Sequence, residues 1–182
     1  GASGFMAIQV VAPSPPDGYT LLMMTSNDTV LPALRANLPI DLERDFAPVS
    51  LVTIGPLMLL VNPSVAVRDD KDLIALERSK PGKLDYGSPG IGTSPHLAGE
   101  LFNLMAKVNL VHVPFKGSSE SVVATAAGDV TACFASVTAA LPLLNNGKLR
   151  ALAVTSAKRV SSVPSIPTLD QSGLPGYDRS SW

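Results

Sequence analysis

The sequence predicts an α/β fold built on a doubly wound, parallel sheet. After Pro48, short apolar runs alternate with helical segments, which is the pattern of successive strand–helix units. Hydrophobic residues make up 46% of the 182 residues, which is enough for a buried core. The 16 Pro and 14 Gly are spread between the apolar runs, so they mark turns rather than a disordered tract.

The first third of the chain is less regular. We expect a short helical or extended segment over residues 5–13 and a turn over residues 15–18. The apolar run at residues 19–25 predicts a buried strand. Residues 29–48 contain Pro at three positions, so we expect short helices there at most.

Strands and helices alternate regularly beyond Pro48. We expect strands over residues 57–62, 84–88, 110–113, 130–135 and 149–155. We expect helices over residues 70–79, 95–107, 119–127 and 138–145. In a parallel sheet of this kind, the loops that follow the strands gather at one edge, where ligands bind. The tail over residues 156–182 is rich in Ser, Pro and Gly.

Charge and composition exclude several classes of function. The 14 Lys+Arg and 15 Asp+Glu give a net charge of −1, so we expect no nucleic-acid partner. Cys133 is the only cysteine and His96 and His112 are the only histidines, which excludes a disulfide and a Cys- or His-rich metal site. We expect no direct membrane insertion, because no apolar run approaches the roughly 20 residues of a spanning helix.

The strongest candidate for a ligand site is the loop over residues 88–96, Ser-Pro-Gly-Ile-Gly-Thr-Ser-Pro-His. Ser94 suits the N-cap of the following helix, and Gly90 and Gly92 let the backbone approach a ligand closely. A helix start offers unpaired N–H groups to a carboxylate or phosphate. We expect the N–H groups of Gly92, Thr93 and Ser94 to hold an anion; an ordinary Gly-rich turn is the alternative.

Three other loop ends carry polar groups. In the second strand-to-helix loop, Ser118 or Ser119 can cap a helix beside the cation of Lys116, although a solvent-exposed Lys beside a normal cap is equally consistent. Ser136 follows a later strand, and Ser26 and Asn27 follow the expected strand at residues 19–25. We expect these loops to add hydroxyl and amide groups to the site.

The sequence lacks the common motifs of cofactor-binding and hydrolytic enzymes. Residues 90–95 lack the third glycine of a dinucleotide-binding loop, and neither a phosphate-binding P-loop nor a Gly-x-Ser-x-Gly elbow occurs. No pair of carboxylates is placed for acid and base chemistry. The polar groups therefore suit holding a small anion better than breaking a bond; a small α/β hydrolase using Ser94 or His96 is the alternative. His112 and Cys133, each within a predicted strand, fit structural roles.

Phrases in a fixed order along the whole chain resemble one family. They are PDGYTLL at 16–22, RDFAPVS at 44–50, PGKL at 81–84, GTSPHLAGELF at 92–102, VHVPFKG at 111–117, GKLRALAVT at 147–155, and Gly-Leu-Pro-Gly at 173–176. This order is similar to that of the substrate-binding receptors of tripartite tricarboxylate transporters, also called Bug proteins.

The resemblance implies a periplasmic-binding-protein-like fold with two doubly wound α/β lobes and a ligand between them. Residues 60–155 would form one lobe, and residues 1–59 and 156–182 would be parts of the other. The chain begins with Gly and ends at Trp182 directly after a turn, so we expect a fragment whose first lobe is incomplete. The family implies a periplasmic location, no cofactor, no catalysis, and delivery of small carboxylates to a membrane transporter.

The family's pocket loops, carried over residue by residue, give the candidate ligand-binding residues. They are Ser26, Asn27, Ser88, Gly90, Gly92, Thr93, Ser94, His96, Lys116, Gly117, Ser118, Ala135 and Ser136. Ala135 departs from the family, because many relatives have an Asp there. The resemblance therefore implies a plain carboxylate ligand rather than an amino acid. A truncated receptor without binding activity is the alternative.

Overall fold

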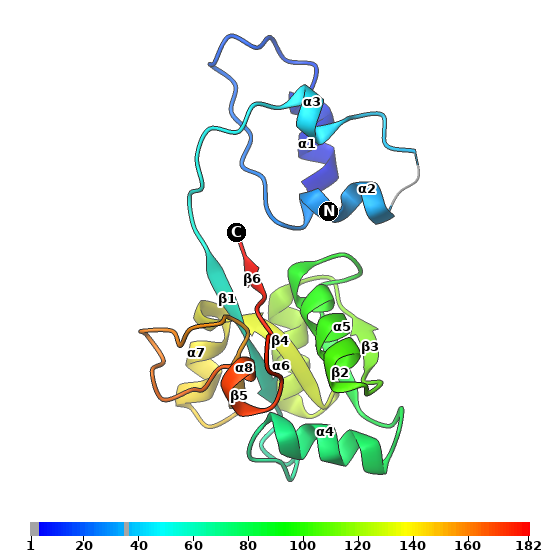
Figure 1. Ribbon diagram of the computed structural model, residues 1–182, viewed down its shortest axis with the longest axis vertical. Helices are drawn as coiled ribbons and strands as arrows, with labels where there is room; N and C mark the ends of the chain where they lie inside the picture. Colours follow the sequence, from blue (N-terminus) through cyan, green and yellow to red (C-terminus); the bar gives the residue numbers. More distant parts are fainter. Residues whose placement is uncertain (1–3, 35–36) are drawn as a thin grey trace. The chain divides into compact units, whose positions relative to one another are not determined.

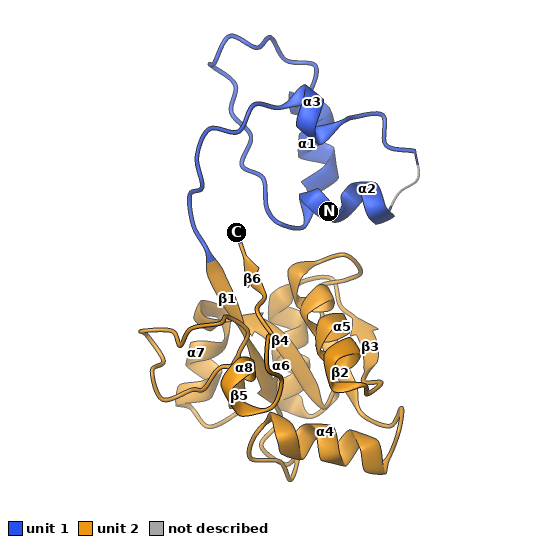
Figure 2. Cartoon of the chain, in the orientation of Figure 1, with its two compact units in different colours: residues 1–54, 182 blue, residues 55–181 orange. Residues whose placement is uncertain are grey.

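The computed structural model describes residues 4–34 and 37–182. The chain divides into two compact units (Figure 2). Unit 1 comprises residues 1–54 with Trp182, and unit 2 comprises Gly55–Ser181. Each unit is described by itself below. In neither is a described helix both long and apolar enough to cross a membrane.

Unit 2 is built on a mixed sheet with the strand order β3-β2-β4-β1-β5 (Figure 1). The strands are β1 (Gly55–Val61), β2 (Asp85–Ser88), β3 (Val111–Pro114), β4 (Ala132–Ser136), β5 (Arg150–Val154) and β6 (Ser180–Ser181). Strand β2 runs parallel to β3 and β4, whereas β1 runs antiparallel to β4, β5 and β6. The predicted α/β fold is confirmed, but the prediction of an all-parallel sheet is wrong at β1.

The sequence did not indicate the direction of β1, because both faces of this strand are buried. Leu59 and Val61 pack in one core cluster, while Met58 and Leu60 pack in the other. A central strand covered on both faces is a continuous apolar run whichever way it points. The run therefore predicted a buried strand correctly and carried no information on its direction.

Helices cover both faces of the sheet. They are α4 (Asp70–Ser79), α5 (Ser94–Ala106), α6 (Ser118–Ala127), α7 (Val137–Asn145) and α8 (Leu169–Ser172). Buried residues of α4, α5 and α8 belong to one core cluster, and those of α6 and α7 belong to the other. The four predicted helices are confirmed to within one residue, because caps such as Asp69, whose carboxylate accepts from the Asp72 N–H, fix their ends locally.

Helix α5 lies unusually close to β2. Gly99 faces Tyr86, and a Cβ at Gly99 would collide with the Tyr86 ring. The Tyr86 side chain is fully buried beneath the helix. The absence of a side chain at Gly99 therefore lets the middle of α5 pack directly on the Tyr86 ring of β2.

Unit 1 contains short helices and no strand among its described residues. They are α1 (Phe5–Val11), η2 (Asp28–Val30), α2 (Leu31–Leu34) and α3 (Leu42–Asp45), in line with the expectation of short helices. The strand predicted over residues 19–25 is wrong: Tyr19, Leu21 and Met23 are 93%, 74% and 77% exposed. An isolated strand has no ladder hydrogen bonds, and the described residues of unit 1 supply no neighbouring strand.

The tail over residues 156–181 packs within unit 2. Thr168 forms a parallel bridge with Val154, and Leu169 and Tyr177 are fully buried in the core. The lobe boundaries predicted for a complete receptor, 60–155 against 1–59 with 156–182, stay a prediction. The compact units of this chain divide at Gly55 instead.

Candidate functional site

Three of the predicted loops meet at one edge of the unit 2 sheet. Strands β3, β2 and β4 are parallel neighbours, so their carboxyl ends point the same way. Ser88 at the end of β2 stands opposite Pro114 at the end of β3. The loops that begin α5, α6 and α7 therefore follow three adjacent strands, as the sequence predicted.

The loop over residues 88–96 is a tight turn into α5. Gly90 and Gly92 adopt φ values of 122° and 80°, a region that glycine enters without strain. Thr93 Oγ1 donates to the Gly90 carbonyl at 2.7 Å. Thr93, rather than the predicted Ser94, occupies the N-cap position, and Ser94 is the first residue of the helix.

Two of the three N–H groups expected to hold an anion already have partners inside the loop. The Gly92 N–H donates to His96 Nδ1 at 3.3 Å, and the Thr93 N–H donates to the Gly90 carbonyl at 3.3 Å. Both are long hydrogen bonds. An anion that bound these two N–H groups would have to break both hydrogen bonds. The sequence alone did not reveal these internal partners.

A partly buried polar cluster lies beneath this loop: Ser88 and Tyr86 are buried, His96 and His112 are half-buried, and Glu100 is exposed. Ser88 Oγ lies 2.6 Å from His112 Nε2, and the rings of His112 and His96 have centroids 4.4 Å apart. Tyr86 Oη donates to Glu100 Oε1 at 2.7 Å. Ser88 is fully buried, and its hydroxyl accepts the Gly90 N–H at 3.1 Å within the loop. Its predicted contact with a ligand stays a prediction.

Burial sets the protonation of both histidines. It lowers the pKa of His96, although Glu100 opposes this, and it lowers the pKa of His112, on which the charge of His96 acts in the same direction. Neutral His96 accepts the Gly92 N–H at Nδ1, so its proton is on Nε2. The loop is thus built around an uncharged imidazole.

The second and third loops expose their polar groups. Lys116 and Ser118 are exposed, while the Lys116 N–H donates to Glu120 Oε2 at 3.2 Å. The predicted serine cap is wrong: Gly117 is the N-cap of α6, and Ser118 is the first residue of the helix. Ser136 is exposed, and its hydroxyl accepts the Ala139 N–H as the N-cap of α7. Ala135, in contrast, is buried in the core.

Ser26 and Asn27 belong to unit 1. The Ser26 N–H donates to the Trp182 carbonyl at 2.9 Å, and Asn27 precedes η2. Their predicted contribution to the same site as the three loops of unit 2 stays a prediction.

Sequence reasoning missed one cation at this edge. The tail returns along β1 as β6 and brings Arg179 to α5, where Nη2 lies 3.5 Å from Ser94 Oγ. Ser94 Oγ also lies 3.1 Å from Ser181 Oγ. These residues are more than 80 positions apart in the sequence, so no local pattern joins them.

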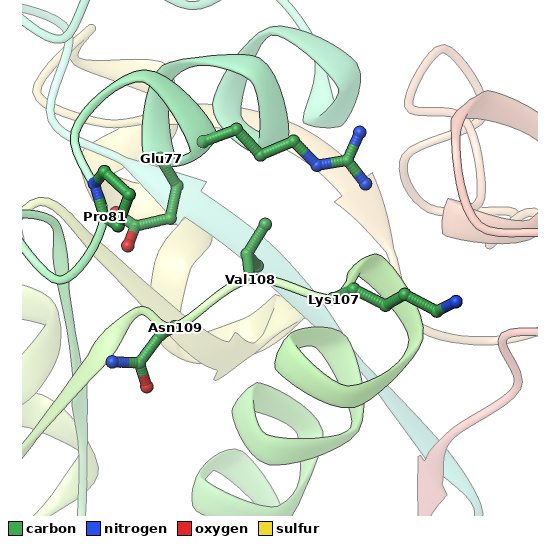
Figure 3. Close-up of a pocket in the computed structure, with 6 residues that line it drawn as sticks. Glu77, Pro81, Lys107, Val108 and Asn109 are labelled. Atoms are coloured by element: carbon green, nitrogen blue, oxygen red, sulfur yellow. The ribbon is translucent and has the colours of Figure 1, made fainter.

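A separate surface cavity of about 330 Å³ lies at the opposite end of α5 (Figure 3). It is lined by Glu77, Arg78, Pro81, Lys107, Val108 and Asn109. Its polar groups serve the fold: the Glu77 carboxylate accepts from the Gly82 and Leu84 N–H groups, and Arg78 donates to the Ala106 carbonyl. A 13-residue helix spans about 20 Å, so this cavity is not part of the predicted loop site.

Two further predictions concern Cys133 and metal binding. Cys133 is fully buried, and burial raises the pKa of its thiol to about 12, which makes it an inert core residue. Across residues 4–34 and 37–182, no group of three or more His, Cys, Asp or Glu side chains is placed to hold a metal ion.

Solved structures place this fold in the class of periplasmic solute-binding proteins. The chain is similar to R. palustris Rpa4515 with adipate (36% identity, TM-score 0.87) and to MatC (Rpa3494) from Rhodopseudomonas palustris with bound malate (30%, 0.84). It is also similar to the periplasmic binding protein BugD (30%, 0.87). Each match covers 100% of this chain and 61–62% of the other.

The chain belongs to the family described as tripartite tricarboxylate transporter family receptor, whose model matches residues 1–182. It is 34% identical over 184 residues to protein BugT of Bordetella pertussis. It is 37% identical over 183 residues to a protein encoded between tcbD and tcbE in Pseudomonas sp. strain P51. Both matches cover 100% of this chain, and they cover 56% of BugT and 54% of the Pseudomonas protein. The chain therefore spans just over half the length of each relative.

These findings confirm the resemblance to the Bug receptors. The family and its structural neighbours are solute-binding receptors and not enzymes, so the hydrolase alternative has no support from them. Two of the similar solved structures are described as periplasmic, and the periplasmic location expected for this chain stays a prediction.

Proposed function

We propose that this chain carries carboxylate-binding loops of a periplasmic solute receptor. In this proposal, the complete receptor holds a small organic carboxylate and delivers it to the membrane components of a tripartite tricarboxylate transporter. We also propose that the ligand binds between the two lobes of the complete receptor.

One observation carries the proposal. The strand-to-helix loops at 88–96, 115–118 and 136–137 follow three adjacent parallel strands, and the first opens a 13-residue helix. A helix start of this kind favours an anion through its dipole. Two similar receptors are described with adipate and malate, which are both carboxylates.

The ligand we propose is a plain carboxylate without an amino group. Ala135 supplies no acidic group to pair with an ammonium, and its side chain is buried. A protein that bound amino acids tightly and showed no preference for plain carboxylates would contradict this part of the proposal.

The test is a thermal-shift screen of this chain against mono-, di- and tricarboxylates, with adipate and malate included. A ligand at 100 times its dissociation constant should stabilise the folded state by about 2.7 kcal/mol. We expect a cooperative melt whose midpoint rises with one class of carboxylate and not with the corresponding amides.

The alternatives predict different outcomes. A cooperative melt without any shift would favour a truncated receptor that cannot bind, and the screen would then be repeated with the longer protein. Turnover of an added ester or amide would favour a hydrolase. Stoichiometric binding without turnover is what the receptor proposal requires.

A further inference from the structure

Arg179 reaches the predicted site through the topology of the sheet. Strand β1 is antiparallel to β4, and the register pairs Leu57 at its start with Ser136 at the end of β4. The start of β1 therefore lies at the edge where the three loops begin. Because β6 pairs with this start, at Gly55 and Pro56, the tail just before Ser180 lies at the same edge.

Hydrogen bonds hold Arg179 in this position. Its backbone N–H donates to the Thr155 carbonyl at 2.7 Å, and Nη1 donates to the Ser180 carbonyl at 2.7 Å. Nη2 lies 3.5 Å from the hydroxyl of Ser94, the first residue of α5. The guanidinium is thus set beside the positive end of a helix dipole.

The charge of Arg179 is not neutralised by the protein. Among the described residues, the single ion pair joins Arg44 to Asp45, and no carboxylate pairs with Arg179. The neighbouring Asp178 carboxylate instead accepts the Ala157 N–H. The Arg179 side chain is half-buried, so part of it remains accessible.

Lys116 is a less suitable cation than Arg179 for binding an anion at this edge. It is exposed, and the carboxylate of Glu120 lies next to its backbone, accepting the Lys116 N–H at 3.2 Å. A flexible lysine loses more side-chain freedom on binding than a guanidinium that is already tethered.

We propose that Arg179 provides the positive charge that binds the ligand's carboxylate at the start of α5, beside Ser94. This inference rests on the proposed function and adds a specificity-determining residue to it. A guanidinium presents paired donors that match a carboxylate, so Arg179 favours a carboxylate over a neutral group of the same shape.

The test separates the charge of Arg179 from its hydrogen bonds. Arg179→Gln keeps an amide donor without charge, and Arg179→Lys keeps the charge. Arg68→Gln is the matched control, because Arg68 is exposed and its backbone N–H, which the substitution keeps, donates to the Asp72 carboxylate. The dissociation constant for adipate and the melting temperature without ligand are measured for each protein.

We expect Arg179→Gln to weaken adipate binding by about tenfold or more, as for the loss of one charge-assisted hydrogen bond. We expect Arg179→Lys to stay within about threefold of the wild type, and Arg68→Gln to bind as the wild type does. If Arg179→Gln does not fold, as judged from its melting curve, the uncharged variant Arg179→Met is measured in its place. If Arg179→Lys does not fold, Arg179→Gln decides alone.

Two results would overturn the inference while leaving the proposed function intact. They are wild-type affinity in Arg179→Gln, and an equal loss in the Gln and Lys variants, which would mean that Arg179 only fastens the tail. If neither the wild-type chain nor the longer protein bound any carboxylate of the screen, the proposed function and this inference would both fall.

Discussion

Asp70 is the residue whose burial is least compensated. It lies in the first turn of α4, is fully buried, and neither of its carboxylate oxygens has a hydrogen-bond partner among the described residues. Gly173 lies so close that an added Cβ would collide with the carboxylate. Burial raises the pKa of Asp70 above its ordinary value, because a charge is costly there, and the nearby Ser172 hydroxyl offsets only part of this effect.

We expect Asp70→Asn to stabilise the protein at pH 7. The folded state binds the Asp70 proton more tightly than the unfolded state, so the contribution of Asp70 to stability falls as pH rises from about 4 through the raised pKa. Asn cannot ionise, and the gain at pH 7 should be about 1 kcal/mol or more. Urea unfolding at pH 4 and pH 7 measures it; a stability difference between the two proteins that does not change with pH would contradict this account.

At the residue scale, the sequence predicted what is local and missed what is distant. Ser94 was placed at a helix start because Gly92, Thr93 and Pro95 surround it in the sequence. Arg179 was missed because β6 brings it back to α5 from the end of the chain. The internal partner of the Gly92 N–H was missed because it depends on the direction of the His96 ring.

The loop over residues 88–96 should also respond to pH. The His96 ring lies beside His112 and Glu100, and the His96 backbone carbonyl accepts from the Tyr86 hydroxyl. Burial lowers the pKa of His96 below the ordinary value of 6.5. The unfolded state therefore takes up the proton more readily, and stability is lost as pH falls below about 6.5. Protonated Nδ1 can no longer accept the Gly92 N–H, so the turn loses a hydrogen bond in the same range.

We expect His96→Asn to reduce this loss. The Asn carbonyl can accept the Gly92 N–H but cannot be protonated. The melting temperature of the variant should therefore fall less between pH 7 and pH 5 than that of the wild type. At pH 8 the two should differ by about 1 kcal/mol or less, since the hydrogen bond is retained. Identical pH profiles for the two proteins would show that His96 does not control the loop.

At the scale of elements, helices were predicted better than strands. Caps and amphipathic spacing lie within each helix, so α4 to α7 could be located from their own residues. A strand depends on its neighbours instead. The apolar run at residues 19–25 predicts a strand but pairs with none in the described chain, and the run of β1 is equally compatible with either direction.

The two units of the whole molecule differ in how much apolar surface they bury. Unit 2 contains two core clusters, one on each face of its sheet. In the described part of unit 1, Ile8 and Leu31 are the buried hydrophobic residues. Its exposed large hydrophobic residues include Tyr19, Leu21, Met23, Val49, Leu51, Val52 and Ile54. Local unfolding should therefore cost far less in unit 1 than in unit 2.

We expect limited proteolysis to cut unit 1 first and to leave a resistant fragment that begins near Gly55. Chymotrypsin should cleave after Tyr19 or Leu21, whose side chains are exposed, well before it reaches the buried Phe102 and Tyr177 of unit 2. Mass spectrometry of a time course identifies the fragments. Early cuts within residues 55–181 would contradict the prediction, because they would mean that the sheet and its two clusters open as readily as the exposed segment before them.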